Sequence, residues 1–557
     1  MCPEPLSLNP EQQSENILCS RRAIGLDRYD FGVLCLYLGV VGWGIWHHLA
    51  CMDEAQAWLI ARDSGLGELL FRRLHYEGAP ALWPLMLWGM ARLHLPYTAI
   101  NWLGGALAAM GTILLLRHAP FPRVIRWLLP FTFFLAYQYA VIARSYVLLP
   151  ALLFGLAILY SLQRSRPVLF AVVAGLLANI SAHGAIVACV LMAMYLVRSR
   201  RVDREGIVAP TRRRAVVAGV FGLMLMTALV VAFPAPDGAF PKNSPATRGR
   251  LHAVLLKLIG PEPSPVSTYP PDPPLEKSPI PGEAGKNSSI VAHAVDYLVP
   301  RLVLTMNAAT YPIAESNLLA LTFYVGWGWW LWSRRQENLL VVYFAAIFLS
   351  CQIWIYSHHS GLFLLLLITL SWIVLETSKQ VRGPRWLERA FGGICVVVVV
   401  LQVGWTTHCL YAEARGPYDP GLATARFLEH AGLEGRAAGF GFETVSAQPY
   451  AVGNLYFNWP HSYYLWSTNA DLSSRRTEVA SRHPAAVVVA EYIDGREDML
   501  NQWMAIAPPG RLEHTEMTAF WQARGYRETH RFCGDRYMRM GVANTVCEVV
   551  LEPLGPR

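Results

Sequence analysis

Long apolar runs recur along most of this chain, and they constrain its fold more than any other feature. The first run, from Phe31 to Ala50, is almost wholly apolar. At a rise of about 1.5 Å per residue, it is long enough to cross the roughly 30 Å hydrocarbon core of a bilayer. Only 15% of the 557 residues are charged, whereas ordinary soluble domains contain about 25%. The sequence therefore predicts an α-helical polytopic membrane protein embedded in a lipid bilayer.

Every second connection between the apolar runs is basic. Examples are the loops Arg117–Arg126, Arg198–Arg204 and Lys379–Arg389. The positive-inside rule places these loops in the cytoplasm, and it places the alternate loops and the C-terminus outside. This arrangement accounts for the net charge of +8. We therefore expect no nucleic acid partner.

Residues 81–116 leave the number of membrane crossings open. They contain two apolar segments, Leu82–Leu95 and Ala99–Leu116, yet the flanking charges require an odd number of crossings. If one segment is re-entrant or interfacial, the chain has about 11 transmembrane helices, and otherwise it has about 12 or 13. The other apolar runs lie at 127–142, 145–162, 167–182, 184–197, 214–233, 317–333, 339–357, 361–376 and 391–409.

The predicted organisation has three parts. Residues 1–30 form a polar cytoplasmic tail, residues 31–410 a transmembrane domain, and residues 411–557 a small soluble α/β domain outside the cytoplasm. Within the transmembrane domain, residues 51–80 form the first outer loop and residues 234–297 a proline-rich outer loop. Because proline-rich sequence favours an extended chain, the second loop is either a linker or a flexible lid over an extracytoplasmic site.

The C-terminal part is more polar and alternates between strand-like and helix-like segments. Ala485–Ala490 and Cys547–Leu551 have the composition of strands, and Gly421–His430 has that of a helix. This alternation is typical of a small α/β domain. Cys533 and Cys547 can form a disulfide if the domain lies in an oxidising compartment.

The adjacent acids Asp53 and Glu54 follow the first apolar run directly. Acids at the mouth of a membrane helix are costly to place, which makes both residues candidates for catalysis. One interpretation is a helix cap, since Asp before an amphipathic run is a good N-cap. The other is a carboxylate that either accepts a proton from an acceptor hydroxyl or holds a divalent cation, with Asp53 as the metal ligand. The two roles are compatible.

His75 and Glu77 form a second polar pair. They lie next to Gly78 and Pro80, which disfavour a helix interior, so we expect both side chains to project from a turn. This turn faces the same loop as Asp53. The pair is either a part of the substrate site or ordinary solvated loop polarity.

Arg144 lies between apolar residues in Ala143-Arg144-Ser145-Tyr146, at a predicted outer membrane boundary. A guanidinium in this position needs an anionic partner, and phosphate suits its planar fork. The alternative is an arginine that reaches lipid headgroups. Arg144 and Tyr146 are therefore candidate substrate-binding residues.

His183, His358 and His359 fall at predicted outer ends of helices. A lone histidine in such a place is more often structural than functional. Together with Asp53 and Arg144, however, they form a polar set on one side of the membrane, and we include them as substrate-binding candidates. The sequence contains no P-loop, dinucleotide fingerprint, zinc signature or nucleophile elbow.

Three short motifs in residues 30–200 resemble a known family. They are Met52-Asp53-Glu54-Ala55, Glu77-Gly78-Ala79-Pro80-Ala81-Leu82-Trp83 and Ala143-Arg144-Ser145-Tyr146. An aspartate in the first outer loop, followed by a proline-containing entry into the next apolar segment, resembles the GT-C membrane glycosyltransferases. The most similar groups are the protein-mannosyltransferase, aminoarabinose-transferase and RgtA-like enzymes.

This resemblance implies transfer of a sugar from a polyprenyl-phosphate donor to a glycan, lipid or protein acceptor outside the cytoplasm, usually with inversion. It implies that Asp53 is the catalytic acid/base, that Glu54 is its partner and that Arg144 binds the donor phosphate. It also implies an integral protein of the bacterial inner membrane. No cofactor follows from it with certainty, and a divalent cation stays open. Where relatives often carry a basic residue before proline, this chain has Gly78-Ala79-Pro80, so His75, Arg72 or Arg73 would make that contact.

Two other classes of protein compete with the enzyme. A polytopic transporter or lipid flippase would show internal inverted repeats and broken helices, and we find no convincing repeat. A non-catalytic receptor or assembly factor would use the outer domain for binding. Asp53, Glu77 and Arg144 within one cavity would favour the enzyme, and wide separation would favour either rival.

Overall fold

The computed structural model describes residues 26–161, 166–203, 210–233, 290–353, 355–378, 382–459, 476–495 and 511–555. Most of the predicted N-terminal tail and of the proline-rich loop lies outside these residues. Within them, six helices are long and apolar enough to cross a membrane: Arg28–His47, Ala99–His118, Ala182–Ser199, Arg212–Val231, Ser357–Thr377 and Arg385–Arg415. Three shorter apolar helices are Ser145–Ser161, Pro167–Ala178 and Asn338–Ser350. The fold is thus a helical bundle compatible with an integral membrane protein.

The bundle surrounds α17 (Ser360–Thr377), an apolar helix of which most residues are buried. A helix without a polar face belongs in the centre of a bundle. Its Trp372 packs against the rings of Phe121 and Phe154. The surrounding long helices are α2 (Arg28–His47), α7 (Ala99–His118), α9 (Leu149–Ser161), α10 (Pro167–Ala178), α11 (Ala182–Asp203), α12 (Pro210–Val231), α14 (Ile290–Thr310), α15 (Asn317–Ser333), α16 (Asn338–Ser350) and α18 (Arg385–Arg415).

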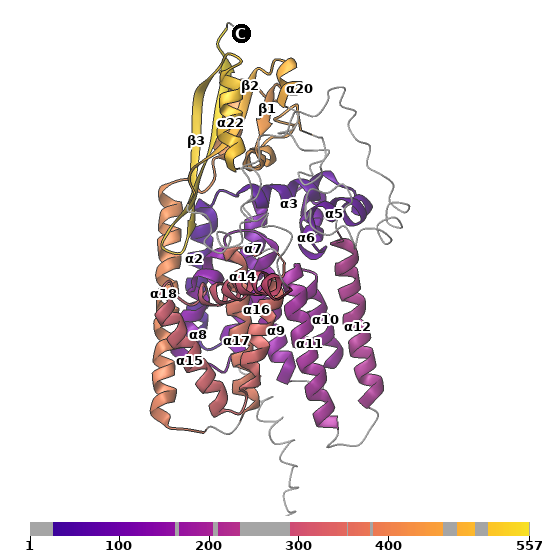
Figure 1. The fold of residues 1–557 in the computed structure, drawn as a ribbon, viewed down its shortest axis with the longest axis vertical. Helices are drawn as coiled ribbons and strands as arrows, with labels where there is room; N and C mark the ends of the chain where they lie inside the picture. Colours follow the sequence, from indigo (N-terminus) through magenta and orange to yellow (C-terminus); the bar gives the residue numbers. More distant parts are fainter. Residues whose placement is uncertain are drawn as a thin grey trace, which may run out of the picture.

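Short helices cover the end of the bundle that faces the sheet. α3 (Met52–Asp63) runs across this end (Figure 1), and α4 (Leu66–Glu68) and α5 (Leu74–Glu77) follow it. α3 ends at Asp63, and Gly65 caps the start of α4.

Two apolar segments do not become single spanning helices. α6 (Leu82–Arg92) has 11 residues, which at about 1.5 Å each cover roughly half of a bilayer core. The structure therefore agrees with a re-entrant or interfacial segment in residues 81–116. The run 127–142 is also not one helix. It begins in α8 (Arg123–Leu128) and continues through short 3₁₀ and π turns, the first of which contains Pro130.

A four-stranded mixed sheet forms the core of the C-terminal part, in the order β1-β2-β4-β3. Only β1 and β2 are parallel. One sheet face packs against α22 through Trp521, and the other faces the bundle. The predicted helix Gly421–His430 is confirmed, as are strands at the two predicted positions. The elements are α19 (Gly421–His430), β1 (Ala437–Phe440), α20 (Arg476–Ser481), β2 (Ala486–Gly495), α22 (Arg511–Gln522), β3 (Tyr526–Met538) and β4 (Gly541–Pro553).

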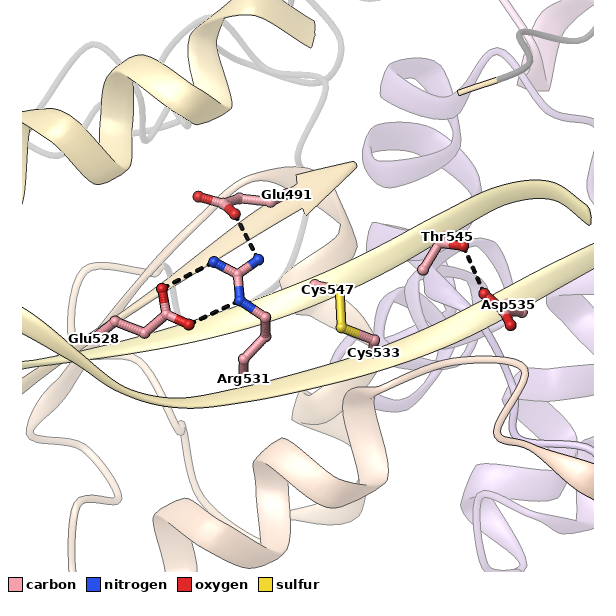
Figure 2. The surroundings of a disulfide bond; sticks show 7 residues. All are labelled: Glu491, Glu528, Arg531, Cys533, Asp535, Thr545 and Cys547. Carbon is pink, nitrogen blue, oxygen red and sulfur yellow. Dashed lines mark hydrogen bonds and ion pairs between the residues drawn. A yellow bond between two sulfur atoms is a disulfide. The ribbon is translucent and has the colours of Figure 1, made fainter. Parts of the chain in front are cut away.

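The β3–β4 hairpin carries a disulfide between Cys533 and Cys547, which are direct partners in the strand register. Figure 2 shows Arg531 beside it, bound to both Glu528 and Glu491. On the other side of the disulfide, Thr545 Oγ1 donates a hydrogen bond of 2.6 Å to Asp535 Oδ1.

The tip of this hairpin reaches the helix bundle (Figure 1). There the guanidinium carbon of Arg539 lies 3.9 Å from the ring centroid of Tyr311. Further up the strand, Arg536 and Asp419 form a buried ion pair of 2.7 Å. The hairpin therefore joins the sheet to the end of the bundle where α3 lies.

Candidate functional site

The start of α3 places two adjacent carboxylates in different surroundings. Helix residues that follow each other point about 100° apart. Glu54 consequently points into the protein and is completely buried, whereas 31% of the Asp53 side chain is exposed. Both acids lie in the first helical turn, where the helix dipole favours negative charge. One side chain is thus part of the core, and the other is open to a ligand.

Glu54 is held by four hydrogen-bond donors. Its Oε2 accepts from the Cys51 N–H at 2.9 Å and from His48 Nε2 at 3.0 Å. Its Oε1 accepts from the Ala143 N–H at 2.7 Å and from Asn101 Nδ2 at 2.8 Å. Burial raises the pKa of Glu54, but the charge of His48 and these hydrogen bonds outweigh it and lower the pKa. Glu54 is therefore a buried anion that holds the start of α3 in place.

His48 connects Glu54 to the last long helix. Its Nδ1 donates to Glu413 Oε1 at 2.9 Å, and the hydroxyl of Tyr137 donates to the same oxygen at 2.6 Å. Burial lowers the pKa of His48, but the two carboxylates outweigh it and raise the pKa to about 10. An imidazolium thus ties together the end of α2, the start of α3 and the end of α18.

His48 and Glu413 are not among the site residues that the sequence predicts. The only signal in the sequence is their position, because each is an ionisable residue at the end of an apolar run. The pair is separated by 365 positions, so no local motif contains it.

Asp53 and Arg144 form an ion pair at the exposed edge of the same region. Arg144 Nη1 lies 3.1 Å from Asp53 Oδ2, and 25% of the Arg144 side chain is exposed. Burial lowers the pKa of Arg144, but the charge of Asp53 outweighs it and raises the pKa. A guanidinium has five N–H donors and a carboxylate has two oxygen acceptors, so each group keeps further hydrogen-bonding capacity beside this contact.

Aromatic rings extend this pair toward the central helix. The Arg144 guanidinium lies 5.7 Å from the ring centroid of Tyr146. The Tyr146 ring in turn lies 5.6 Å from His358 and 5.5 Å from His359. His183 lies 4.2 Å from His359, measured between ring centroids. The structure thus groups the predicted histidines with Arg144, although they come from α11 and from the turn before α17.

One ring nitrogen in this group lacks a protein partner. His358 Nε2 is buried and has no hydrogen-bond partner within the described ranges. A buried polar atom without a partner is costly, and a ligand can satisfy it.

His75 and Glu77 lie in α5, so the expectation that both project from a turn is wrong. Glu77 is near enough to Asp53 for the charge of Asp53 to affect its pKa. Gln56, one turn after Asp53 on α3, donates a hydrogen bond from Nε2 to Glu77 Oε1. Burial raises the pKa of Glu77 to about 8, with a further increase from the charge of Asp53. At neutral pH Glu77 is therefore mostly a neutral carboxylic acid, which can donate a hydrogen bond.

His75 and Arg73 have other partners. His75 Nδ1 lies against the carbonyl oxygen of Phe233, at the end of α12. Arg73 is paired with Glu68, with Nε at 3.0 Å from Oε1. The structure thus gives both residues contacts outside the Asp53–Arg144 pair.

No group of three or more His, Cys, Asp and Glu side chains in the described part of the chain is arranged to hold a metal ion. A cation at Asp53 would therefore need ligands from a substrate or from solvent in addition to this carboxylate.

No protein-family model matches the chain, and no curated protein matches it either.

Proposed function

We propose that this protein is a GT-C-like membrane glycosyltransferase that transfers a sugar from a polyprenyl-phosphate donor to an acceptor outside the cytoplasm. The observation that carries the proposal is the 3.1 Å contact between Asp53 and Arg144. It places a partly exposed carboxylate beside a partly exposed guanidinium at one end of a bundle of apolar helices.

The cationic and aromatic side of the site suits the donor. The Arg144 fork can bind a phosphate through donors that Asp53 leaves open. The Nε2 of His358, which has no hydrogen-bond partner among the described residues, would provide a further polar contact nearby. A phosphate leaving group is already an anion, so it needs electrostatic stabilisation more than it needs a proton.

The acidic side suits the acceptor. An acceptor hydroxyl attacks the anomeric carbon of the sugar, and its proton passes to Asp53 as general base. The bond between that carbon and the phosphate oxygen breaks, and its electron pair stays on the phosphate, which Arg144 stabilises. Attack opposite to the leaving group inverts the anomeric configuration.

Glu77 and Glu54 have different roles in this scheme. Neutral Glu77 donates a hydrogen bond to the sugar without repelling the phosphate. Glu54 is a positioning residue, because its four donors set the start of α3 and therefore the direction of Asp53.

The proposal includes a membrane topology. The chain would have a GT-C-type architecture of about 11–13 transmembrane helices, with the sheet outside the cytoplasm of a bacterial inner membrane. The disulfide between Cys533 and Cys547 supports an oxidising compartment for the sheet. The acceptor would be a glycan, lipid or protein on that side of the bilayer.

The geometry favours an enzyme over a transporter or lipid flippase. Transporters bind substrate near the middle of the membrane, between broken helices. Asp53, Glu77 and Arg144 instead gather at the end of the bundle that faces the sheet, next to α3 (Figure 1).

A direct assay tests the proposal. Purified protein in lipid nanodiscs is incubated with a panel of polyprenyl-phosphate sugars and with a cell-envelope extract as the source of acceptor, and mass spectrometry measures release of the polyprenyl phosphate. Release by wild type but not by Asp53→Asn supports the enzyme. Movement of intact donor lipid between leaflets without any release supports a flippase instead.

A further inference from the structure

A second cationic site lies on the sheet, at the end far from the helix bundle. β2 runs antiparallel to β4, and Val487 near its start pairs with Leu551 near the end of β4. This end of the sheet points away from the bundle in Figure 1. A pocket of about 260 Å³ opens at this end, lined by Arg436, Phe457, Arg482, His483, Pro484 and Ala485.

Backbone hydrogen bonds fix the walls of this pocket. The Phe457 N–H donates to the Ala437 carbonyl at 3.0 Å, and the Ala485 N–H donates to the Arg436 carbonyl at 3.1 Å. These bonds therefore hold the segments around Arg436, Phe457 and Ala485 next to one another. Groups on such a fixed frame do not need to be ordered when a ligand binds.

The turn before β2 adopts an unusual backbone conformation. His483 has φ of +49°, a left-handed conformation that is uncommon for a residue other than glycine. Its N–H donates to the Ala480 carbonyl at 3.1 Å, and the Arg482 N–H donates to the Val479 carbonyl at 3.1 Å. Strained residues that the surrounding structure maintains are concentrated at ligand sites. Here the strained turn directs two basic side chains to one pocket.

The pocket has a surplus of positive charge. Arg482 is paired with Glu478 at 2.9 Å, yet 58% of the Arg482 side chain remains exposed. The side chains of Arg436 and His483 have no hydrogen-bond or ion-pair partner in the part of the chain that the structure describes. Arg436 therefore adds to the pocket a charge with which no acid among the described residues forms an ion pair. Phe457 contributes a partly buried ring that packs on the core beneath the sheet.

We propose that this pocket binds an acidic saccharide. Arginine forks match the geometry of carboxylate and phosphate groups. A partly buried aromatic ring beside them offers a flat apolar surface to the C–H face of a sugar. The site is not catalytic, and it is separate from the Asp53–Arg144 pair at the opposite end of the sheet. It would hold an anionic glycan at the outer tip of the protein whether or not the protein transfers sugars.

The test is calorimetric titration of the full chain in nanodiscs. The probes are trigalacturonate, mannose 6-phosphate and neutral maltotriose. We expect an acidic probe to bind and maltotriose not to bind. Binding of trigalacturonate alone identifies a uronic acid ligand, and binding of mannose 6-phosphate alone identifies a sugar phosphate. Equal affinity for maltotriose, or no binding of either acidic probe, overturns the proposal.

Matched variants distinguish binding of the acidic probe in this pocket from a general attraction of anions to a positively charged surface. Arg436→Gln combined with Arg482→Gln should weaken acidic binding at least tenfold. The charge-matched control combines Arg415→Gln with Arg426→Gln, two exposed arginines of α18 and α19, and it should bind as wild type does. An equal loss in both double variants contradicts the proposal. Asp53→Asn should not change this binding, so failure of the pocket and failure of the transfer reaction are distinguishable.

Discussion

Arg144 and Asp53, 91 positions apart in the sequence, form a partly exposed ion pair with 3.1 Å between Nη1 and Oδ2. Directly behind it, Glu54 is completely buried and accepts hydrogen bonds from four donors. One carboxylate of the acidic pair is thus part of the core, whereas its neighbour is partly exposed. This division of roles leads to separate predictions for each residue.

Replacement of Arg144 should weaken donor binding more than acceptor binding. Loss of a charged hydrogen-bonding partner costs about 1.5–3 kcal/mol, so Arg144→Ala should raise the donor Kd by roughly 10–100-fold. Arg144→Lys keeps the charge but lacks the planar guanidinium, so its donor Kd should lie between those of wild type and Arg144→Ala. Titration of a polyprenyl-phosphate sugar into each variant measures the effect. An unchanged donor affinity in Arg144→Ala would rule out the phosphate role.

Replacement of Glu54 should destabilise the fold. Glu54→Gln removes a buried charge and directs an amide N–H₂ at groups that are themselves donors, so we expect a loss of about 3 kcal/mol. Glu77→Gln is the matched control, since neutral Glu77 already resembles an amide at pH 7. Thermal unfolding in detergent compares the two. Similar melting temperatures for both variants would contradict the anchoring role of Glu54.

The stability of the protein should depend on pH through His48. Its pKa is about 10 in the folded protein and about 6.5 in an unfolded chain. The raised pKa means that its contribution to stability is complete below about pH 6.5 and is lost as the pH rises toward 10. His48→Asn should therefore lack this decline in melting temperature between pH 7 and pH 10. The same decline in the variant would show that another group is responsible.

Donor binding should depend on pH through Glu77. Its pKa of about 8 means that it ionises as the pH passes 8, and the new charge then lies near Asp53 and a bound phosphate. The KM for the donor should consequently rise above pH 8 in wild type. In Glu77→Gln it should stay level across the same range. A parallel rise in both proteins would exclude Glu77 as the cause.

The disulfide should stabilise the outer sheet. Removal of a native disulfide typically costs about 2–5 kcal/mol, so Cys533→Ser combined with Cys547→Ser should lower the melting temperature of this part. Wild type treated with a reductant should behave in the same way. Thiol labelling of non-reduced protein from membranes provides the check on the compartment. Free thiols at both positions would argue against an oxidising environment.

Hydrophobic periodicity and composition predicted much of the fold, because helices and strands depend mainly on residues that are close in the sequence. The apolar character of Phe31–Ala50 and the helix pattern of Gly421–His430 depend on neighbouring residues, and helices lie at both places. The run 127–142 misled the prediction because its apolar side chains are buried in short turns, and composition does not distinguish such turns from a spanning helix. Proline at position 130 was the available signal against a continuous helix.

The candidate site was predictable only in part. Asp53, Glu77 and Arg144 were grouped correctly because charge patterning assigned their segments to one side of the bundle. The contact between His48 and Glu413 joins residues 365 positions apart, and a single sequence contains no record of such a pairing. The contact of His75 with the Phe233 carbonyl was not predictable either, because it depends on how the end of α12 packs.

Single-turnover kinetics of Asp53→Asn are the most direct test of whether Asp53 is the base for sugar transfer. A general base contributes about 10²–10⁴-fold to a rate. With donor and acceptor both saturating, release of polyprenyl phosphate should therefore slow by that factor, while donor Kd and melting temperature stay close to wild type. A transfer rate within a few-fold of wild type would contradict the account.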